Sequence, residues 1–137
     1  MGVLIDNFEQ CYLLNIESMD DTHRVFVDLV NRLGVAGKPE FTDLFSELVT
    51  HTQAHFDQEN RWMEASDFPA ITEHRDEHQR VLGELNRFAQ KVASGSVIMG
   101  RAYVTQQLPQ WFDLHARTMD SALAAHLKHT GFVFLHT

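Results

Sequence analysis

Five histidines and two carboxylates recur in this chain at spacings that are typical of metal ligands on helices. The set consists of His23, His55, Glu59, His74, His78, His115 and Asp120. His55 and Glu59 are four residues apart, as are His74 and His78. Residues at i and i+4 stack on one helix face, with Cβ atoms about 5–6 Å apart. Imidazole and carboxylate donors together suit Fe, Mn, Zn, Ni or Cu, so the spacing predicts a transition-metal site.

Four amphipathic segments are expected to carry these residues. Apolar side chains recur at helical spacing in each segment, and Gly and Pro interrupt the pattern between them. The predicted helices start at Asp20 or Asp21, run from about Pro39 to Ala65, start again at Pro69, and run from about Arg101 to Lys128. Residues 94–100 are expected to form a loop, and Pro109 is expected to break the last helix near Leu108.

Four helices with short joins predict an all-α fold, an up-down-up-down antiparallel four-helix bundle with an N-terminal arm. The whole chain, 1–137, is expected to form one domain. Its parts would be an arm at 1–18, the bundle at about 19–128 and a tail at 129–137.

The candidate ligands lie within the apolar stripes, and antiparallel packing would bring them to one end of the bundle. Asp120 is the exception, because it follows His115 by five residues. Five residues turn an ideal helix about 140° past the starting face. Asp120 therefore needs a local distortion, such as a π-turn, to reach the others.

Each candidate has an ordinary alternative when it is taken alone. A core histidine such as His23 is usually hydrogen-bonded, His74 and His78 could be a surface pair, and His55 with Glu59 could be an ion pair. Burying all of them unpartnered would cost several kcal/mol each, a cost that metal coordination removes. Two bridging carboxylates and a solvent-derived bridge would give each of two metals three ligands. The five histidines then leave one metal with six ligands and the other with five. The Glu-x-x-His pairs of ferritin-like di-iron proteins do not occur in this sequence.

Composition restricts the other functions. The chain has 137 residues, a formal charge of -8 and nine histidines. The acidic balance argues against nucleic acid and against anionic membrane surfaces. A single cysteine, Cys11, allows no intrachain disulfide and is expected to be a plain thiol of the arm. With neither a signal-peptide pattern nor a membrane-spanning run, we expect a cytoplasmic protein.

Four sequence motifs resemble those of the hemerythrins, in particular the single-domain bacterial hemerythrins. They are MDDTH at 19–23, HFDQE at 55–59, HRDEH at 74–78 and WFDLHARTMD at 111–120, and the resemblance covers about Ile16 to Leu123. It implies two iron ions joined by an oxo or hydroxo bridge. His74, His78 and His115 would hold the six-coordinate iron and His23 and His55 the five-coordinate iron. Glu59 and Asp120 would bridge the pair.

The resemblance also implies that O2 binds reversibly at the open position. Phe56, Trp111, Phe112 and Ala116 would surround the O2 pocket, and they also suit plain core packing. Asn60 stands where the family usually has Glu, and His51 where it often has Tyr. We expect His51 to form a hydrogen bond and not to be a ligand. His126, His129 and His136 match no ligand position and are expected to be exposed.

The expected function is O2 storage, delivery or sensing by a non-heme di-iron protein. An enzyme on the same site (a peroxidase, an oxidase or a nitric-oxide-handling protein) is the alternative, as is an iron-buffering module. We favour an O2-binding protein over an enzyme. Azide and NO are further candidate ligands, and the sequence indicates no particular protein partner.

Overall fold

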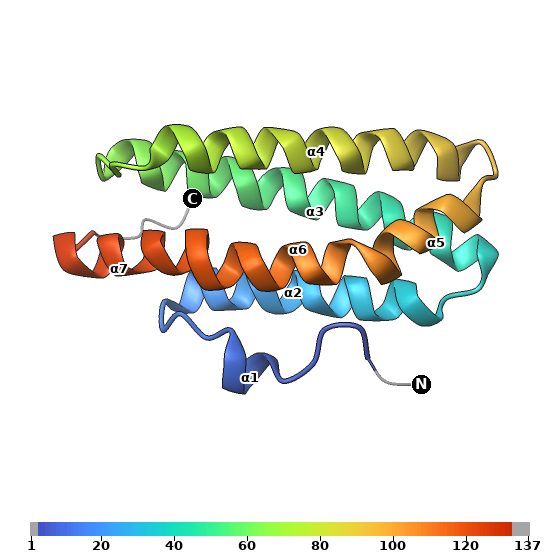
Figure 1. Ribbon diagram of the computed structural model, residues 1–137, viewed down its shortest axis with the longest axis horizontal. Coiled ribbons are helices and arrows are strands. Elements are labelled where there is room, and N and C mark those ends of the chain that lie inside the picture. The colour runs from blue at the N-terminus through green and yellow to red at the C-terminus, as the bar shows by residue number, and fades with distance from the viewer. Residues whose placement is uncertain (1–2, 133–137) are drawn as a thin grey trace.

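Regular structure is entirely helical in the part of the chain that the computed structural model describes, residues 3–132. The elements are α1 (Phe8–Cys11), α2 (Glu17–Val35), α3 (Lys38–Ala65), α4 (Ile71–Ala93), α5 (Val97–Gln106), α6 (Leu108–His115), the π-helix η1 (Ala116–Asp120) and α7 (Ser121–Thr130). In Figure 1, α2, α3, α4 and the continuous path from α5 to α7 lie alongside one another, and the chain reverses at each join. This arrangement is consistent with the predicted four-helix bundle. Of the helices within 3–132, none has both the length and the apolar composition needed to cross a bilayer.

The core consists of two apolar clusters with the polar candidate residues between them. Along α2, Met19 belongs to one cluster and Phe26 to the other, and the buried His23 lies between them. Along α3 the order is Phe56, then Glu59, then the second cluster. The polar site is therefore closed on both sides by packed hydrocarbon.

The first long helix starts earlier than its sequence predicts. α2 begins at Glu17, so Asp20 lies inside its first turn and is not the N-cap. The buried Asp20 carboxylate instead accepts backbone hydrogen bonds from Leu14 (2.8 Å) and Asn15 (3.0 Å). Asp20 thus holds the arm against the start of α2, and the predicted arm, 1–18, includes the first residues of this helix.

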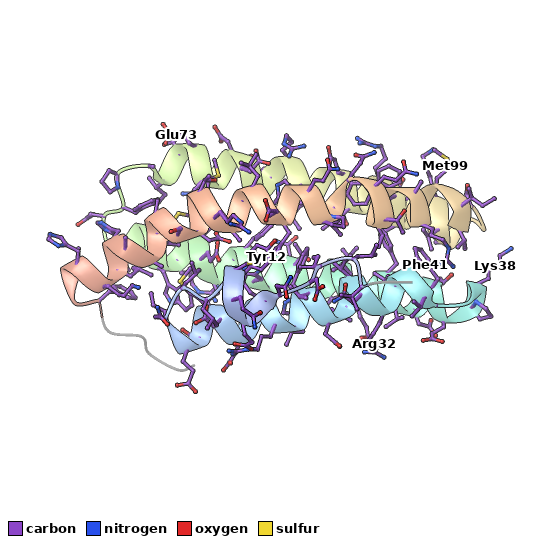
Figure 2. All side chains as sticks on the ribbon, turned by 60° about the horizontal axis from the view of Figure 1, so that its bottom comes forward. Tyr12, Arg32, Lys38, Phe41, Glu73 and Met99 are labelled. Atoms are coloured by element: carbon purple, nitrogen blue, oxygen red, sulfur yellow. The ribbon has the colours of Figure 1, made fainter. Side chains whose placement is uncertain are left out.

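The arm is attached to the bundle at two further points. Tyr12 donates a hydrogen bond from its hydroxyl to Asp113 Oδ1 (2.6 Å), and Lys128 Nζ donates to the Leu14 carbonyl (2.8 Å). Figure 2 shows Tyr12 projecting from the short helix of the arm. Of the predicted tail, 129–137, the last residues, 133–137, lie outside the described part of the chain.

Two of the predicted boundaries are shifted and one is confirmed. Pro69 lies in a turn, and α4 begins at Ile71. The predicted loop at 94–100 is wrong in its second half, because α5 begins at Val97. A Cβ on Gly100 would collide with Val92, so glycine allows α5 to pack closely on the end of α4. The break near Leu108 is confirmed, with Pro109 in the first turn of α6.

Candidate metal centre

All seven predicted ligand residues come together inside the bundle, and all are buried. Their nitrogen and oxygen atoms form two groups, and within each group these atoms lie within 4.8 Å of one another. One group contains Glu59, His74, His78, His115 and Asp120, and the other contains His23, His55 and Glu59. Glu59 belongs to both, so the groups adjoin.

Glu59 turns one carboxylate oxygen to each group of histidines. Its Oε2 lies 2.7 Å from His55 Nε2 and 3.9 Å from His23 Nε2. Its Oε1 lies 3.2 Å from His78 Nε2 and 3.4 Å from His74 Nε2. A carboxylate placed in this way can bridge two cations.

Asp120 is divided between the same two sides. Its Oδ2 lies 3.1 Å from His23 Nε2, and its Oδ1 lies 3.2 Å from both His74 Nε2 and His115 Nε2. The two carboxylates therefore separate the five histidines into a pair, His23 and His55, and a trio on the other side.

The π-helix η1 brings Asp120 into the site. It begins directly after His115 and ends at Asp120. A π-turn holds more residues than an α-turn, so two residues five apart in sequence can share a face. The distortion predicted from the spacing of His115 and Asp120 is confirmed.

Aromatic rings fix the planes of two histidines in the trio. Phe56 stacks on His78 with ring centroids 3.9 Å apart and planes inclined by 7°. Trp111 stacks on His115 at 4.6 Å and 19°, and its Nε1 donates to Glu77 Oε1 at 3.0 Å. These contacts limit the movement of the imidazoles and keep Nε2 turned toward the carboxylates.

Many polar atoms of the site have no hydrogen-bond partner among residues 3–132. They include both ring nitrogens of His23, His74 and His115 and both carboxylate oxygens of Asp120. A buried polar group left unpaired costs about 1–3 kcal/mol. Metal ions bound between the histidines and carboxylates would satisfy these atoms together, and the donor set of imidazole and carboxylate fits such ions.

Without a metal, the site is strongly polarised. Burial lowers the pKa of His74, but Asp120 and Glu59 outweigh burial and raise that pKa to about 9. Burial raises the pKa of both carboxyl groups, yet the surrounding histidines hold each pKa well below its ordinary value. At neutral pH the carboxylates are therefore ionised and His74 is protonated, so metal binding must release the His74 proton.

A narrow space next to the centre is too small for a water-sized sphere. Its lining comprises Phe26, His55, Phe56, Trp111, Phe112, His115 and Asp120. Phe56, Trp111 and Phe112 were predicted to surround a ligand pocket, whereas Ala116 is buried nearby without lining this space. Phe26 was missed, although it follows His23 by three residues and so shares its helix face. Its ring stacks on Phe112 at 5.3 Å and 21°.

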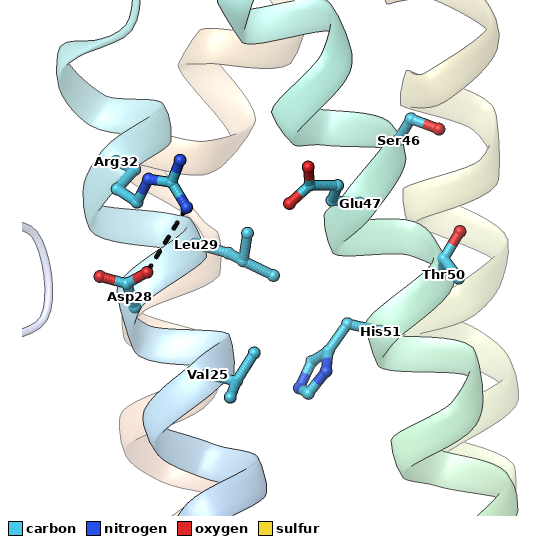
Figure 3. A pocket seen from close by; sticks show the side chains of 8 residues that line it. All are labelled: Val25, Asp28, Leu29, Arg32, Ser46, Glu47, Thr50 and His51. Carbon is cyan, nitrogen blue, oxygen red and sulfur yellow. Dashed lines mark ion pairs between the residues drawn. The ribbon is translucent and has the colours of Figure 1, made fainter.

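His51 lies outside both groups. Its Nε2 donates a hydrogen bond to the Thr22 carbonyl (3.1 Å), as expected for a hydrogen-bonded residue that is not a ligand. Figure 3 shows its ring in a surface groove between α2 and α3, beside Val25 and Leu29. The metal-ligand set thus ends at His55 on this helix.

The extra histidines of the last helix differ from one another. His126 is half-buried and donates from Nε2 to the Ser66 carbonyl (2.8 Å), so the prediction that it is exposed is wrong. His129 is exposed, and His136 lies outside the described residues.

The fold and the site define a helical-bundle protein with a polar cluster capable of binding metal ions in its core. The family described as "Hemerythrin HHE cation binding domain" matches residues 14–129. The chain belongs to the hemerythrin family.

Relatives and solved structures agree with this assignment. The chain is 37% identical over 112 residues to a bacteriohemerythrin of Ralstonia nicotianae (strain ATCC BAA-1114 / GMI1000), covering 82% of this chain and 81% of that protein. It is 24% identical over 119 residues to a bacteriohemerythrin of Stenotrophomonas maltophilia (strain R551-3), covering 84% and 76%. Crystal structures of two hemerythrin mutants share the fold, each with a TM-score of 0.80 over 92% of this chain and 98% of the other, at 20% and 21% identity.

Proposed function

We propose that this protein binds two iron ions at the seven-residue centre and uses them to bind O2 reversibly. The observation that carries the proposal is the division of both carboxylates between the two groups of histidines. A cluster built for one ion would not need Glu59 and Asp120 each to turn one oxygen to either side.

The division of donors is unequal. On one side, Glu59 Oε1 and Asp120 Oδ1 face three histidine nitrogens, from His74, His78 and His115. On the other, Glu59 Oε2 and Asp120 Oδ2 face only His23 and His55. The side with two histidines therefore offers one donor fewer, and we assign the open position to it. When bound, a ferrous pair would supply the electrons and the open coordination position that O2 requires.

The pocket residues determine what reaches that position. Phe26, Phe56 and Phe112 are almost completely buried, and the space they enclose does not admit water. An apolar, dry pocket keeps protons and water away from a bound ligand, which protects it from side reactions. Because the space is so narrow, a diatomic ligand enters only when these rings move.

The test is to load the metal-free protein with Fe²⁺ under anaerobic conditions, measure iron per chain, and then add O2. We expect two irons per chain and a change in the visible spectrum that reverses when O2 is removed. Far fewer than two irons per chain would refute the proposal.

The same experiment separates the enzymatic alternative. Irreversible oxidation on the first addition of O2, followed by turnover with a reductant, would indicate a di-iron oxidase or peroxidase. Iron uptake without any response to O2 would indicate a metal-buffering module.

A further inference from the structure

One histidine of the centre is held differently from the other four. His78 Nδ1 lies 2.9 Å from Asn60 Oδ1, in hydrogen-bond geometry. The Nδ1 atoms of the remaining histidines have no hydrogen-bond partner among residues 3–132; these are His23, His55, His74 and His115. His78 is therefore the ring whose outer nitrogen is fixed by a side chain.

The direction of this hydrogen bond follows from the position of the opposite nitrogen. His78 Nε2 faces Glu59 Oε1 at 3.2 Å, inside the group of donor atoms. A metal bound there takes the Nε2 lone pair, so the imidazole proton must be on Nδ1. Nδ1–H then donates to the amide oxygen of Asn60, because an oxygen acceptor is required at that distance.

Asn60 and Phe56 restrict the same ring in complementary ways. The Phe56 ring stacks on the face of His78, which fixes the plane of the imidazole. Asn60 holds the edge of the ring and thereby fixes its rotation within that plane. Both residues lie on α3, whereas His78 lies on α4, so the contact also joins the two helices.

We propose that Asn60 is a positioning residue that fixes the Nδ1–H tautomer of His78 and sets its donor strength toward the metal. An acceptor at the outer nitrogen makes an imidazole a stronger ligand, and a carboxylate does so more than a neutral amide. Asn60 therefore orients His78 while leaving it a moderate donor. A moderate donor favours the ferrous over the ferric state, which is the state that the proposed O2 binding needs.

The hydrogen bond can be tested without iron. Zn²⁺ is redox-inert and diamagnetic, so we would load wild type, Asn60→Asp and Asn60→Leu with Zn²⁺ and follow the His78 Nδ1–H resonance by NMR. We expect a protected proton in wild type, a further downfield proton in Asn60→Asp, and rapid solvent exchange in Asn60→Leu. Identical resonances in all three proteins would overturn the proposal. Asn60→Ala replaces Asn60→Leu if the larger side chain prevents folding.

The donor strength is tested with iron, and this part rests on the proposed function. We expect Asn60→Asp to raise the ratio of ferric to ferrous affinity about tenfold, equivalent to a potential about 59 mV lower for a one-electron step. Asn60→Leu should shift the potential in the opposite direction. A shift of the same sign in both variants would show a merely structural role and overturn the proposal.

A matched variant controls for charge. Gln90→Glu adds the same charge at an exposed position on α4 and should leave the potential unchanged; a shift equal to that of Asn60→Asp would overturn the proposal. If wild type fails to bind two irons, the proposed function fails, while the zinc experiment still decides the role of Asn60.

Discussion

Replacing Glu59 by glutamine tests the bridging geometry most directly. The substitution keeps the size of the side chain and removes its charge. Both oxygens of Glu59 are used, one on each side of the centre, so each side loses an anionic donor. The side of His23 and His55 is left with a single carboxylate oxygen, from Asp120. We therefore expect Glu59→Gln to bind at most one iron per chain, on the side of the three histidines.

The effect on stability can be estimated from linkage. A ligand present at 100 times its dissociation constant stabilises the folded protein by about 2.7 kcal/mol. A hundredfold loss of affinity would remove nearly all of that stabilisation. For a chain of 137 residues, this corresponds to a Tm roughly 10 °C lower in the metal-loaded state. The metal-free variant should differ much less, because the glutamine side chain still fills the site.

The assay combines iron analysis with thermal unfolding of wild type and variant, with and without metal. Glu73→Gln is the matched control, since Glu73 is an exposed carboxylate on α4, close to His74 in sequence (Figure 2). It should retain two irons and the full metal-induced rise in Tm. Two irons and a full rise in Tm for Glu59→Gln would refute the bridging role, as would an equal loss in both variants.

Three other perturbations address the stability and the pocket of the protein. In the metal-free protein, the pKa of His74 is raised from 6.5 to about 9, so its stabilising contribution is complete below pH 6.5 and is lost as pH rises through 9. Urea unfolding across this range should show a loss of up to roughly 3 kcal/mol, and a flat profile would contradict the protonation of His74. Thr52 Oγ1 is buried without a hydrogen-bond partner in the described residues, so Thr52→Val should raise the free energy of unfolding by about 1 kcal/mol. A decrease would reveal a partner for the hydroxyl. Phe112→Leu should retain two irons but speed their oxidation in air, because the pocket wall loses its stacking on Phe26; an unchanged oxidation rate would refute the role of Phe112 in that wall.

The seven candidate residues were predictable because helical periodicity determines both face and level. His55 and Glu59 near the end of one helix, and His74 and His78 near the start of the next, must meet if the join is short. Even the π-helix was predictable in kind, because an ordinary helix cannot turn both His115 and Asp120 inward.

The features that were not predictable depend on contacts between distant segments. Asp20 resembles a helix cap in sequence, yet its carboxylate binds the arm, and local propensity cannot distinguish the two roles. The hydrogen bond from His126 to Ser66 joins residues 60 positions apart. The close packing around Gly100 likewise depends on Val92 and Phe41, which lie on other helices.

The π-helix also acts as a one-residue insertion in the repeat of the last helix. Continued from Leu108, Phe112 and His115, an unbroken α-helix would turn Met119 and His126 toward the core. Both are only half-buried, and the fully buried positions are instead Asp120, Leu123, Ala124 and Leu127. The whole of α7 is therefore shifted by one residue. The same widened turn that delivers a carboxylate to the metal centre sets the register of the hydrophobic seal beneath it, so ligation and packing cannot be altered independently.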